Sequence, residues 1–443
     1  MTARPEPAAL RTGPRPLPLH LLTALQSWSS CELGLSLSKP GSPNSNDRGP
    51  NGSANPRSNP PATDFRAALA PILAEIAAAS PPPCPGETSS ADDPFRQALR
   101  REVMRRLDRL AAGVIAYRDH PGRRALDDPP IVWSEGATAL RDVGAARDVD
   151  IANDATPLLL VPSLVNRWQV LDLAPGRSFA RALAAAGFRP WIVDWGTPGD
   201  AERALDTDGC VARLGRAVDW LSATTGARRL PALGYCMGGT LIVGLAAHRP
   251  GALSAIGILA APWDFHADRA GQGMLAATGP MLAELAARVG ELPADIVQTL
   301  FWSLDPWQVV EKFRRFAGMD MASDAARDFV LLEDWLNEGA ALPGPVARDC
   351  LVGWYGDNLP GRGEWKVGGR PVRPAEIGTP ALVAIPAADR IVPPASAAGL
   401  CGPAGLANAT RLDLPLGHIG MMVGSRAAER CWKPVIAWLN QHR

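Results

Sequence analysis

The sequence predicts an α/β fold, in which a mostly parallel sheet is covered by helices, with a helical cap insertion and a disordered N-terminal tail. Three observations lead to this prediction. From Pro157 onward, apolar strand-like runs alternate with helix-like runs. These strand-like runs are continuously apolar, which is typical of parallel strands that are buried on both faces. The alternation stops over residues 263–374, where helix-like segments follow one another without a core strand.

The first 91 of the 443 residues differ in composition from the rest. Residues 29–64 are rich in Ser, Pro, Asn and Gly, so they bury too little apolar area to offset the entropy lost on ordering. The alanine-rich residues 67–79 favour an isolated helix that ends at three consecutive prolines. We therefore expect a disordered tail over residues 1–91 and one folded domain over residues 92–443.

The folded domain is expected to begin with a helix over residues 92–117, because apolar residues recur there every three or four positions. Two opening strands are predicted at residues 131–133 and 138–141. The alternating region then predicts strands at 158–161, 190–193, 230–233, 255–260, 381–385 and 410–414, and helices at 179–185, 211–223, 240–247 and 432–439.

Residues 263–374 are expected to form a cap insertion over the site described below. Their patterns predict helices at 274–289, 294–302 and 324–337. The chain has 14 tryptophans, and several lie in or beside this block: Trp263, Trp302, Trp307, Trp335 and Trp354.

Composition excludes several classes of protein. The 45 basic and 45 acidic residues give a formal net charge of +0, which does not indicate binding to nucleic acid or to an anionic membrane surface. The seven cysteines have no CxxC spacing, which favours a reduced, cytoplasmic protein without a zinc site. No apolar run approaches the roughly 18 residues needed to span a bilayer.

The segment Gly234-Tyr235-Cys236-Met237-Gly238-Gly239 lies between a predicted strand and a predicted helix. This layout is typical of a strained strand-to-helix turn that exposes a nucleophile, with glycines where a Cβ would collide with backbone. The nucleophile here is the thiol of Cys236, which indicates thioester chemistry. A buried structural thiol is the alternative interpretation, and the context of the turn argues against it.

A general base and an orienting carboxylate are predicted later in the chain. His418 follows the last predicted strand and has glycine neighbours, so we expect it to be the base. Asp389 follows the strand predicted at 381–385, where a carboxylate can orient the imidazole, although a turn-forming or ion-paired Asp is the alternative. Asp413 is a weaker candidate because it lies within a strand. The oxyanion hole is expected from the backbone N–H groups of Met237 and Val165.

Together these motifs resemble the polyhydroxyalkanoate synthases, a family of the α/β-hydrolase superfamily, and most closely the class III catalytic subunit. The resemblance runs from about residue 92 to the C-terminus. Besides the cysteine segment, it rests on five stretches: Leu164-Val165-Asn166-Arg167, Val193-Asp194-Trp195-Gly196, Trp302-Ser303-Leu304-Asp305-Pro306, Asp389-Arg390-Ile391-Val392-Pro393 and Gly417-His418-Ile419-Gly420. The order of nucleophile, acid and histidine is also that of α/β-hydrolases. Two features depart from the family: Arg390 stands where a histidine is common, and the N-terminal tail is unusual for the short class.

The resemblance implies polymerisation of (R)-3-hydroxyacyl-CoA into polyester. Cys236 would carry the acyl group as a thioester, and His418 would deprotonate the thiol or the substrate hydroxyl. Asp389 would support His418 or activate the 3-hydroxyl. The family needs no metal or redox cofactor, and its substrate is an acyl-CoA. A second, noncatalytic synthase subunit, a homo-oligomer and a cytoplasmic location at the surface of polyester granules are further expectations.

Two other functions remain open from the sequence. The same three residues would serve a thioesterase or a polyester depolymerase, which transfers the acyl group to water. A noncatalytic granule-associated homologue is the second alternative, and the presence of Cys236, Asp389 and His418 argues against it.

Overall fold

The computed structural model describes residues 11, 13–16, 19–20, 94–152 and 154–443. The described residues fall into two compact units. One comprises the residues up to Asp119 together with Pro306–Asp320, and the other comprises His120–Asp305 and Met321–Arg443. Most of the tail predicted over residues 1–91, including the helix predicted at 67–79, lies outside the described residues.

The smaller unit is built on two helices, α3 (Pro94–Asp119) and α9 (Pro306–Phe316). They approach closely at Gly113, where an added Cβ would lie 2.0 Å from the carbonyl oxygen of Phe313. The rings of Tyr117 and Phe313 meet edge to face, with centroids 5.6 Å apart. The sequence predicted α3 to within two residues at each end but did not predict α9, although Val310, Phe313 and Phe316 form a buried helical stripe.

The larger unit contains an eight-stranded sheet in the order β1-β2-β6-β3-β7-β8-β13-β14. The pairs β1–β2 and β2–β6 are antiparallel, and the other five pairs are parallel, so the sheet is mostly parallel as predicted. The strands are β1 (Ile131–Glu135), β2 (Thr138–Asp142), β3 (Thr156–Val161), β6 (Phe188–Asp194), β7 (Leu230–Tyr235), β8 (Leu253–Leu259), β13 (Ala381–Pro386) and β14 (Ala409–Leu414).

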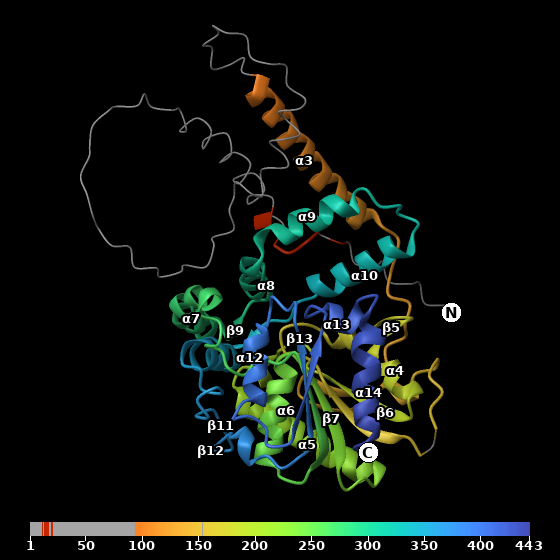
Figure 1. The fold of residues 1–443 in the computed structure, drawn as a ribbon, viewed down its shortest axis with the longest axis vertical. Coiled ribbons are helices and arrows are strands. Elements are labelled where there is room, and N and C mark those ends of the chain that lie inside the picture. The colour runs from red at the N-terminus through yellow and green to blue at the C-terminus, as the bar shows by residue number, and fades with distance from the viewer. Residues whose placement is uncertain (1–10, 12, 17–18, 21–93, 153) are drawn as a thin grey trace, which may run out of the picture. The chain divides into compact units, whose positions relative to one another are not determined.

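Helices cover this sheet, and α5 and α6 lie side by side on it (Figure 1). The helices outside the insertion are α4 (Phe179–Ala185), α5 (Thr207–Thr225), α6 (Met237–His248), α12 (Pro394–Ala398), α13 (Gly420–Val423) and α14 (Lys433–Asn440). The central strands β3, β7 and β13 bury apolar side chains throughout or nearly so, because both faces are covered. The continuous apolar runs of the sequence therefore correspond to the centre of the sheet.

The block over residues 263–374 contributes no strand to the eight-stranded sheet. Its helices in the larger unit are α7 (Arg269–Val289), α8 (Ala294–Leu304), α10 (Asp324–Asn337), α11 (Gly344–Arg348) and a π-helix (Asp349–Gly356). Two short antiparallel pairs also lie here: β9 (Glu291–Leu292) with β10 (Leu342–Pro343), and β11 (Lys366–Val367) with β12 (Arg370–Pro371). The predicted helices at 274–289, 294–302 and 324–337 are confirmed. The division into one domain over residues 92–443 with a cap stays a prediction.

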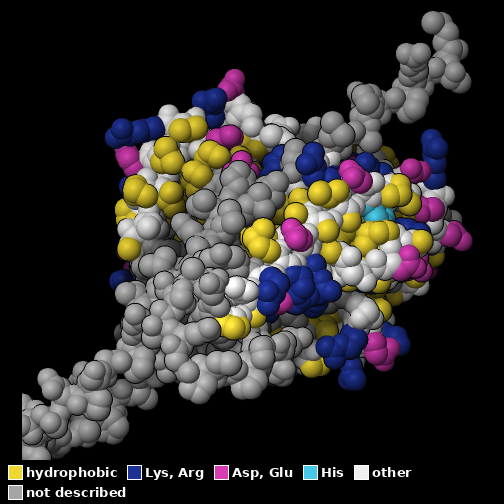
Figure 2. Space-filling view, turned by 90° about the horizontal axis from the view of Figure 1, so that it is seen from above, with side chains coloured by type: hydrophobic (Ala, Val, Ile, Leu, Met, Phe, Trp, Pro, Cys, Tyr) yellow, Lys and Arg dark blue, Asp and Glu magenta, His cyan; other side chains and the backbone are white. Residues whose placement is uncertain are grey.

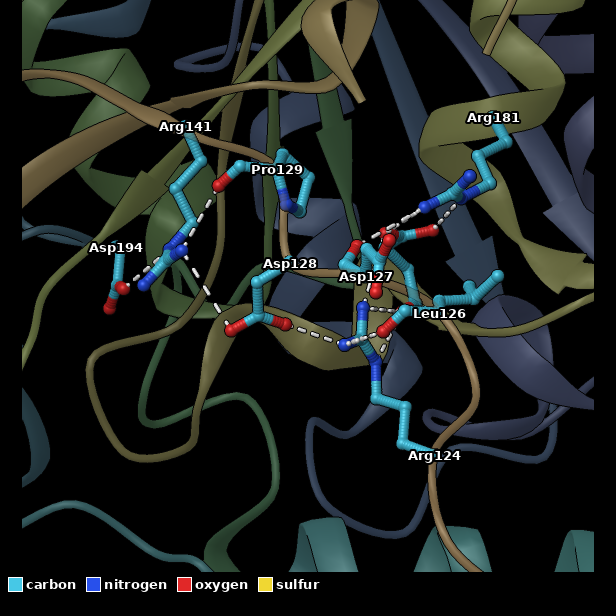
Figure 3. A network of polar contacts seen from close by, with 9 residues as sticks. Arg124, Leu126, Asp127, Asp128, Pro129, Arg141, Arg181 and Asp194 are labelled. Atoms are coloured by element: carbon cyan, nitrogen blue, oxygen red, sulfur yellow. Dashed lines mark hydrogen bonds and ion pairs between the residues drawn. The ribbon is translucent and has the colours of Figure 1, made fainter. Parts of the chain in front are cut away.

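Arginine side chains connect residues 120–130, the segment before β1, to the rest of the larger unit (Figure 3). Arg141 on β2 donates one hydrogen bond of 2.8 Å to Asp194 at the end of β6 and another of 3.1 Å to the carbonyl oxygen of Pro129. Arg124, within the segment, donates to the carbonyl oxygen of Asp172 at 3.0 Å and also pairs with its neighbour Asp128 at 2.5 Å. These side chains supply hydrogen-bond donors to backbone carbonyl groups of a segment that lies before the first strand.

The surface seen in Figure 2 carries Lys and Arg interspersed with Asp and Glu and with hydrophobic side chains. This mixture agrees with the formal net charge of +0. Among the described residues, no helix is long and apolar enough to cross a membrane.

Candidate active site

Cys236 occupies the sharp turn between β7 and α6. Its backbone has φ 55° and ψ −130°, a conformation that costs a residue with a Cβ about 1–3 kcal/mol. The Cys236 N–H donates to the carbonyl oxygen of Leu259 on β8 at 2.9 Å, which anchors the turn to the neighbouring strand. The thiol therefore sits at the end of the central strand and at the N-terminus of a helix, where the helix dipole favours a negative charge.

The glycines around Cys236 are required by close backbone contacts. A Cβ on Gly234 would lie 2.5 Å from the backbone of Gly238. A Cβ on Gly238 would lie 2.1 Å from the carbonyl oxygen of Val161, at the end of β3. The first turn of α6 thus packs directly on the end of β3, as the spacing of the glycines predicts.

Asp389 and His418 lie on neighbouring loops at the ends of β13 and β14. The Ala388 N–H donates 3.0 Å to the carbonyl oxygen of Leu416, which joins the two loops. The Asp389 Oδ2 atom is 2.7 Å from His418 Nδ1. Its Oδ1 atom accepts from the N–H groups of Ile391 and Val392 at 2.8 and 2.9 Å, so both carboxylate oxygens have partners.

The imidazole of His418 connects Asp389 to Cys236. Burial lowers the pKa of His418, but the negative charge of Cys236, hydrogen bonds with Asp389 and Cys236, and the charge of Asp389 together raise it to about 10. Cys236 and His418 are each only 6% exposed. The arrangement favours the protonated imidazolium of His418 in a site that is largely closed to bulk water.

Tyr235 is a further residue at this site that the sequence analysis did not single out. Its hydroxyl donates 3.2 Å to the carbonyl oxygen of His418, and the two rings lie 5.1 Å apart. Burial raises the pKa of Tyr235 well above its ordinary value, so the hydroxyl remains a donor. Its position directly before Cys236 is the one sequence signal that could have drawn attention to it.

The two predicted oxyanion donors lie on either side of the packed turn. Met237 is the first residue of α6, so its N–H has no acceptor within the helix. Val165 lies in the loop after β3, and its N–H is 3.4 Å from the hydroxyl oxygen of Ser163, which is long for a hydrogen bond. The roles of Met237 and Val165 as oxyanion donors stay predictions.

The alternative carboxylate Asp413 lies elsewhere. It pairs with Arg411 at 2.9 Å, and both side chains are at least half exposed. Arg390, which directly follows Asp389, pairs at 2.5 Å with Asp305 at the end of α8. Within the described residues, no group of three or more His, Cys, Asp or Glu side chains could hold a metal ion. The structure thus pairs His418 with Asp389, brings Cys236 close enough to raise the pKa of His418, and leaves Asp413 elsewhere.

Comparison with known proteins places the chain in a family. Residues 156–425 match the family described as alpha/beta hydrolase fold. Poly(3-hydroxyalkanoate) polymerase subunit PhaC of Allochromatium vinosum is 28% identical over 289 residues, which span 64% of this chain and 81% of the relative. The same subunit of Haloarcula marismortui is 28% identical over 298 residues, spanning 66% of this chain and 62% of the relative. That of Thiocystis violacea is 28% identical over 289 residues, spanning 65% and 81%. The chain therefore belongs to the α/β-hydrolase fold family, and it is a homologue of the poly(3-hydroxyalkanoate) polymerases.

Proposed function

We propose that this protein is the catalytic subunit of a polyhydroxyalkanoate synthase, which transfers (R)-3-hydroxyacyl groups from CoA thioesters to a growing polyester. The observation that carries the proposal is Cys236 at a strained turn, close enough that its charge raises the pKa of His418, which is itself paired with Asp389 at 2.7 Å. The homology to polymerase subunits supports the same reaction.

In the first step, the Cys236 thiolate attacks the carbonyl carbon of the acyl-CoA. The oxygen becomes negatively charged in the tetrahedral intermediate, where the N–H groups of Met237 and Val165 stabilise it. The C–S bond to CoA then breaks, and the leaving thiolate takes a proton from the His418 imidazolium. The acyl group is now a thioester of Cys236, so one thioester has been exchanged for another at little cost in free energy.

In the second step, the 3-hydroxyl of another hydroxyacyl group gives its proton to His418 and attacks the Cys236 thioester. An ester bond forms and the bond to the Cys236 sulfur breaks, so the chain grows by one unit. Asp389 keeps the His418 ring oriented and stabilises its charged form. The limited exposure of Cys236 and His418 supports an organic hydroxyl as the acceptor in place of water.

The proposal includes partners and location. The relatives are named as subunits, so a second, noncatalytic synthase subunit is proposed, together with assembly of several copies of this chain. A cytoplasmic location at the surface of the polyester product is proposed with it. No metal or redox cofactor is needed, because thioester exchange and ester formation require only a nucleophile, a base and oxyanion donors.

The test is CoA release from (R)-3-hydroxybutyryl-CoA and longer acyl chains, with the product sized and with Cys236→Ala compared against Cys401→Ala. Cys401 is a half-buried thiol elsewhere in the chain, so its loss controls for removal of a thiol as such. CoA release with high-mass polyester, lost only in Cys236→Ala, is expected. Release of free hydroxy acid alone would make the protein a thioesterase. No release, even with a candidate second subunit added, would support a noncatalytic homologue.

A further inference from the structure

The loop that carries Val165 is held by the insertion. The carbonyl oxygen of Val165 accepts from the Ala340 N–H at 3.1 Å. The carbonyl oxygen of Arg167 accepts from the indole Nε1–H of Trp335 at 2.8 Å. The backbone carbonyls of Val165 and Arg167 are therefore both bound from near the end of α10. Trp335 lies in its last turn, and Ala340 follows it by three residues.

A third contact reaches the residue between them. The side-chain amide of Gln298, on α8, donates to Asn166 Oδ1 at 3.4 Å. Gln298 also packs against Gly339, where an added Cβ would lie 2.4 Å from Gln298 Nε2. Since Gly339 directly precedes Ala340, the contacts from α8 and from the turn after α10 support each other. Val165, Asn166 and Arg167 are thus each bonded to a different residue of the insertion.

We propose that Trp335 is a positioning residue for acyl transfer. By fixing the carbonyl oxygen of Arg167, its indole N–H holds the preceding peptide units so that the Val165 N–H faces the oxygen of the tetrahedral intermediate. The inference rests on the proposed function, because it assigns to the insertion a part in the chemistry of the Cys236 site. Trp335 does not touch the reacting atoms and acts only through the loop.

Geometry explains why such support matters. An oxyanion donor is effective when it lies about 2.7–3.1 Å from the charged oxygen, and a misplacement of about 1 Å can cost about 100-fold in rate. In the structure the Val165 N–H has the Ser163 hydroxyl at 3.4 Å as a competing acceptor. A loop released from Trp335 can tighten that contact and turn the N–H away from the substrate. Trp335 is 4% exposed, so water does not readily replace its indole N–H.

The test compares Trp335→Phe with Trp354→Phe. Both substitutions replace a buried indole by a phenyl ring, but the Nε1 atom of Trp354 has no hydrogen-bond partner in the described part of the chain. Three quantities are measured: kcat and KM for CoA release, the rate of Cys236 acylation by a p-nitrophenyl ester, and the rate of Cys236 alkylation by iodoacetamide. Alkylation requires the thiolate but no oxyanion hole, so it separates the two parts of the site.

For Trp335→Phe we expect kcat and ester acylation to fall by about 10-fold or more, below the 100–1,000-fold typical of losing an oxyanion donor outright. KM and the alkylation rate should stay within about twofold of the unsubstituted protein, since ground-state binding and the thiolate are untouched. An equal fall in alkylation, or a kcat no lower than that of Trp354→Phe, would overturn the inference.

Gln298→Met provides a second variant in case Trp335→Phe does not fold. It keeps the length of the side chain but removes the donor to Asn166, and it should lower kcat in the same direction without changing alkylation. Failure of the proposed function is distinguishable from these outcomes, because the unsubstituted protein would then form no high-mass polyester, while ester acylation still reports on the oxyanion hole.

Discussion

Alanine at Gly238 is expected to damage both stability and activity, because its methyl group would overlap backbone. The Cβ would lie 2.1 Å from the carbonyl oxygen of Val161 and 2.7 Å from that of Pro162. Real Cβ atoms essentially never approach another heavy atom within 3.0 Å, so α6 and the end of β3 must separate by roughly 1 Å. Neither oxygen belongs to a flexible side chain that could move aside.

Separating α6 from the end of β3 would displace both donors of the proposed oxyanion hole. Met237 directly precedes the substituted residue, and Val165 follows the end of β3 by four residues. Overpacking of a well-packed interior costs about 1–3 kcal/mol, and we expect the upper part of that range because the clash is with backbone. A shift of about 1 Å between two donors and their substrate lowers kcat by about 100-fold.

The assay combines thermal unfolding with CoA release, and Gly378→Ala is the control. A Cβ on Gly378 meets nothing within 4 Å, so that substitution should leave the melting temperature and kcat unchanged. For Gly238→Ala we expect a melting temperature lower by several degrees and kcat lower by about 100-fold. If Gly238→Ala kept the melting temperature and kcat of the unsubstituted protein, the close packing of α6 on β3 would be refuted.

Two further predictions concern ionised groups. The folded pKa of His418 is raised to about 10 from 6.5, so its stabilising contribution is complete below pH 6.5 and is lost as the pH rises through about 10. The melting temperature of the unsubstituted protein minus that of His418→Gln should therefore shrink over this window, and a constant difference would contradict it. Glu202→Ala removes the carboxylate that pairs at 2.8 Å with the buried Arg213, and leaves Arg213 with the Thr138 hydroxyl at 3.0 Å and the partly exposed Glu135 at 3.4 Å. We expect urea unfolding to show a loss of about 3 kcal/mol, near the lower end for a broken buried pair, against less than about 1 kcal/mol for the exposed Arg390→Ala. Equal losses in the two variants would refute this contrast.

The sheet could be predicted from the sequence because its central strands are continuous apolar runs bounded by glycine and polar residues. The turn at Cys236 could be predicted because only glycines allow α6 to contact β3 so closely. The contact between Asp389 and His418 follows from one further fact, the parallel pairing of β13 with β14, which brings the two following loops side by side. These features depend on local patterns and on one rule of sheet topology.

The contacts of the insertion could not be predicted in the same way. The hydrogen bond from Trp335 to Arg167 joins residues 168 positions apart, and its donor is an indole on a helix whose pattern indicates only burial. The grouping of α9 with α3 in one unit is equally non-local. An amphipathic pattern specifies which face of a helix is buried, but it does not specify what covers that face.

The turn at Cys236 and the Asp389–His418 pair alone do not select between water and a hydroxyacyl group as acceptor. In the proposed mechanism both reactions pass through the same thioester of Cys236. That selection must come from segments that control access to Cys236 and stabilise its intermediate. Under the proposed function the insertion would meet the second requirement, because Trp335, Ala340 and Gln298 together bind the loop of Val165. If the insertion moved away from the sheet to admit water, these bonds would break and the oxyanion hole would lose one donor. Under the proposed function we therefore expect an opened site to be a poor hydrolase, with the rate of acyl transfer coupled to the position of the insertion.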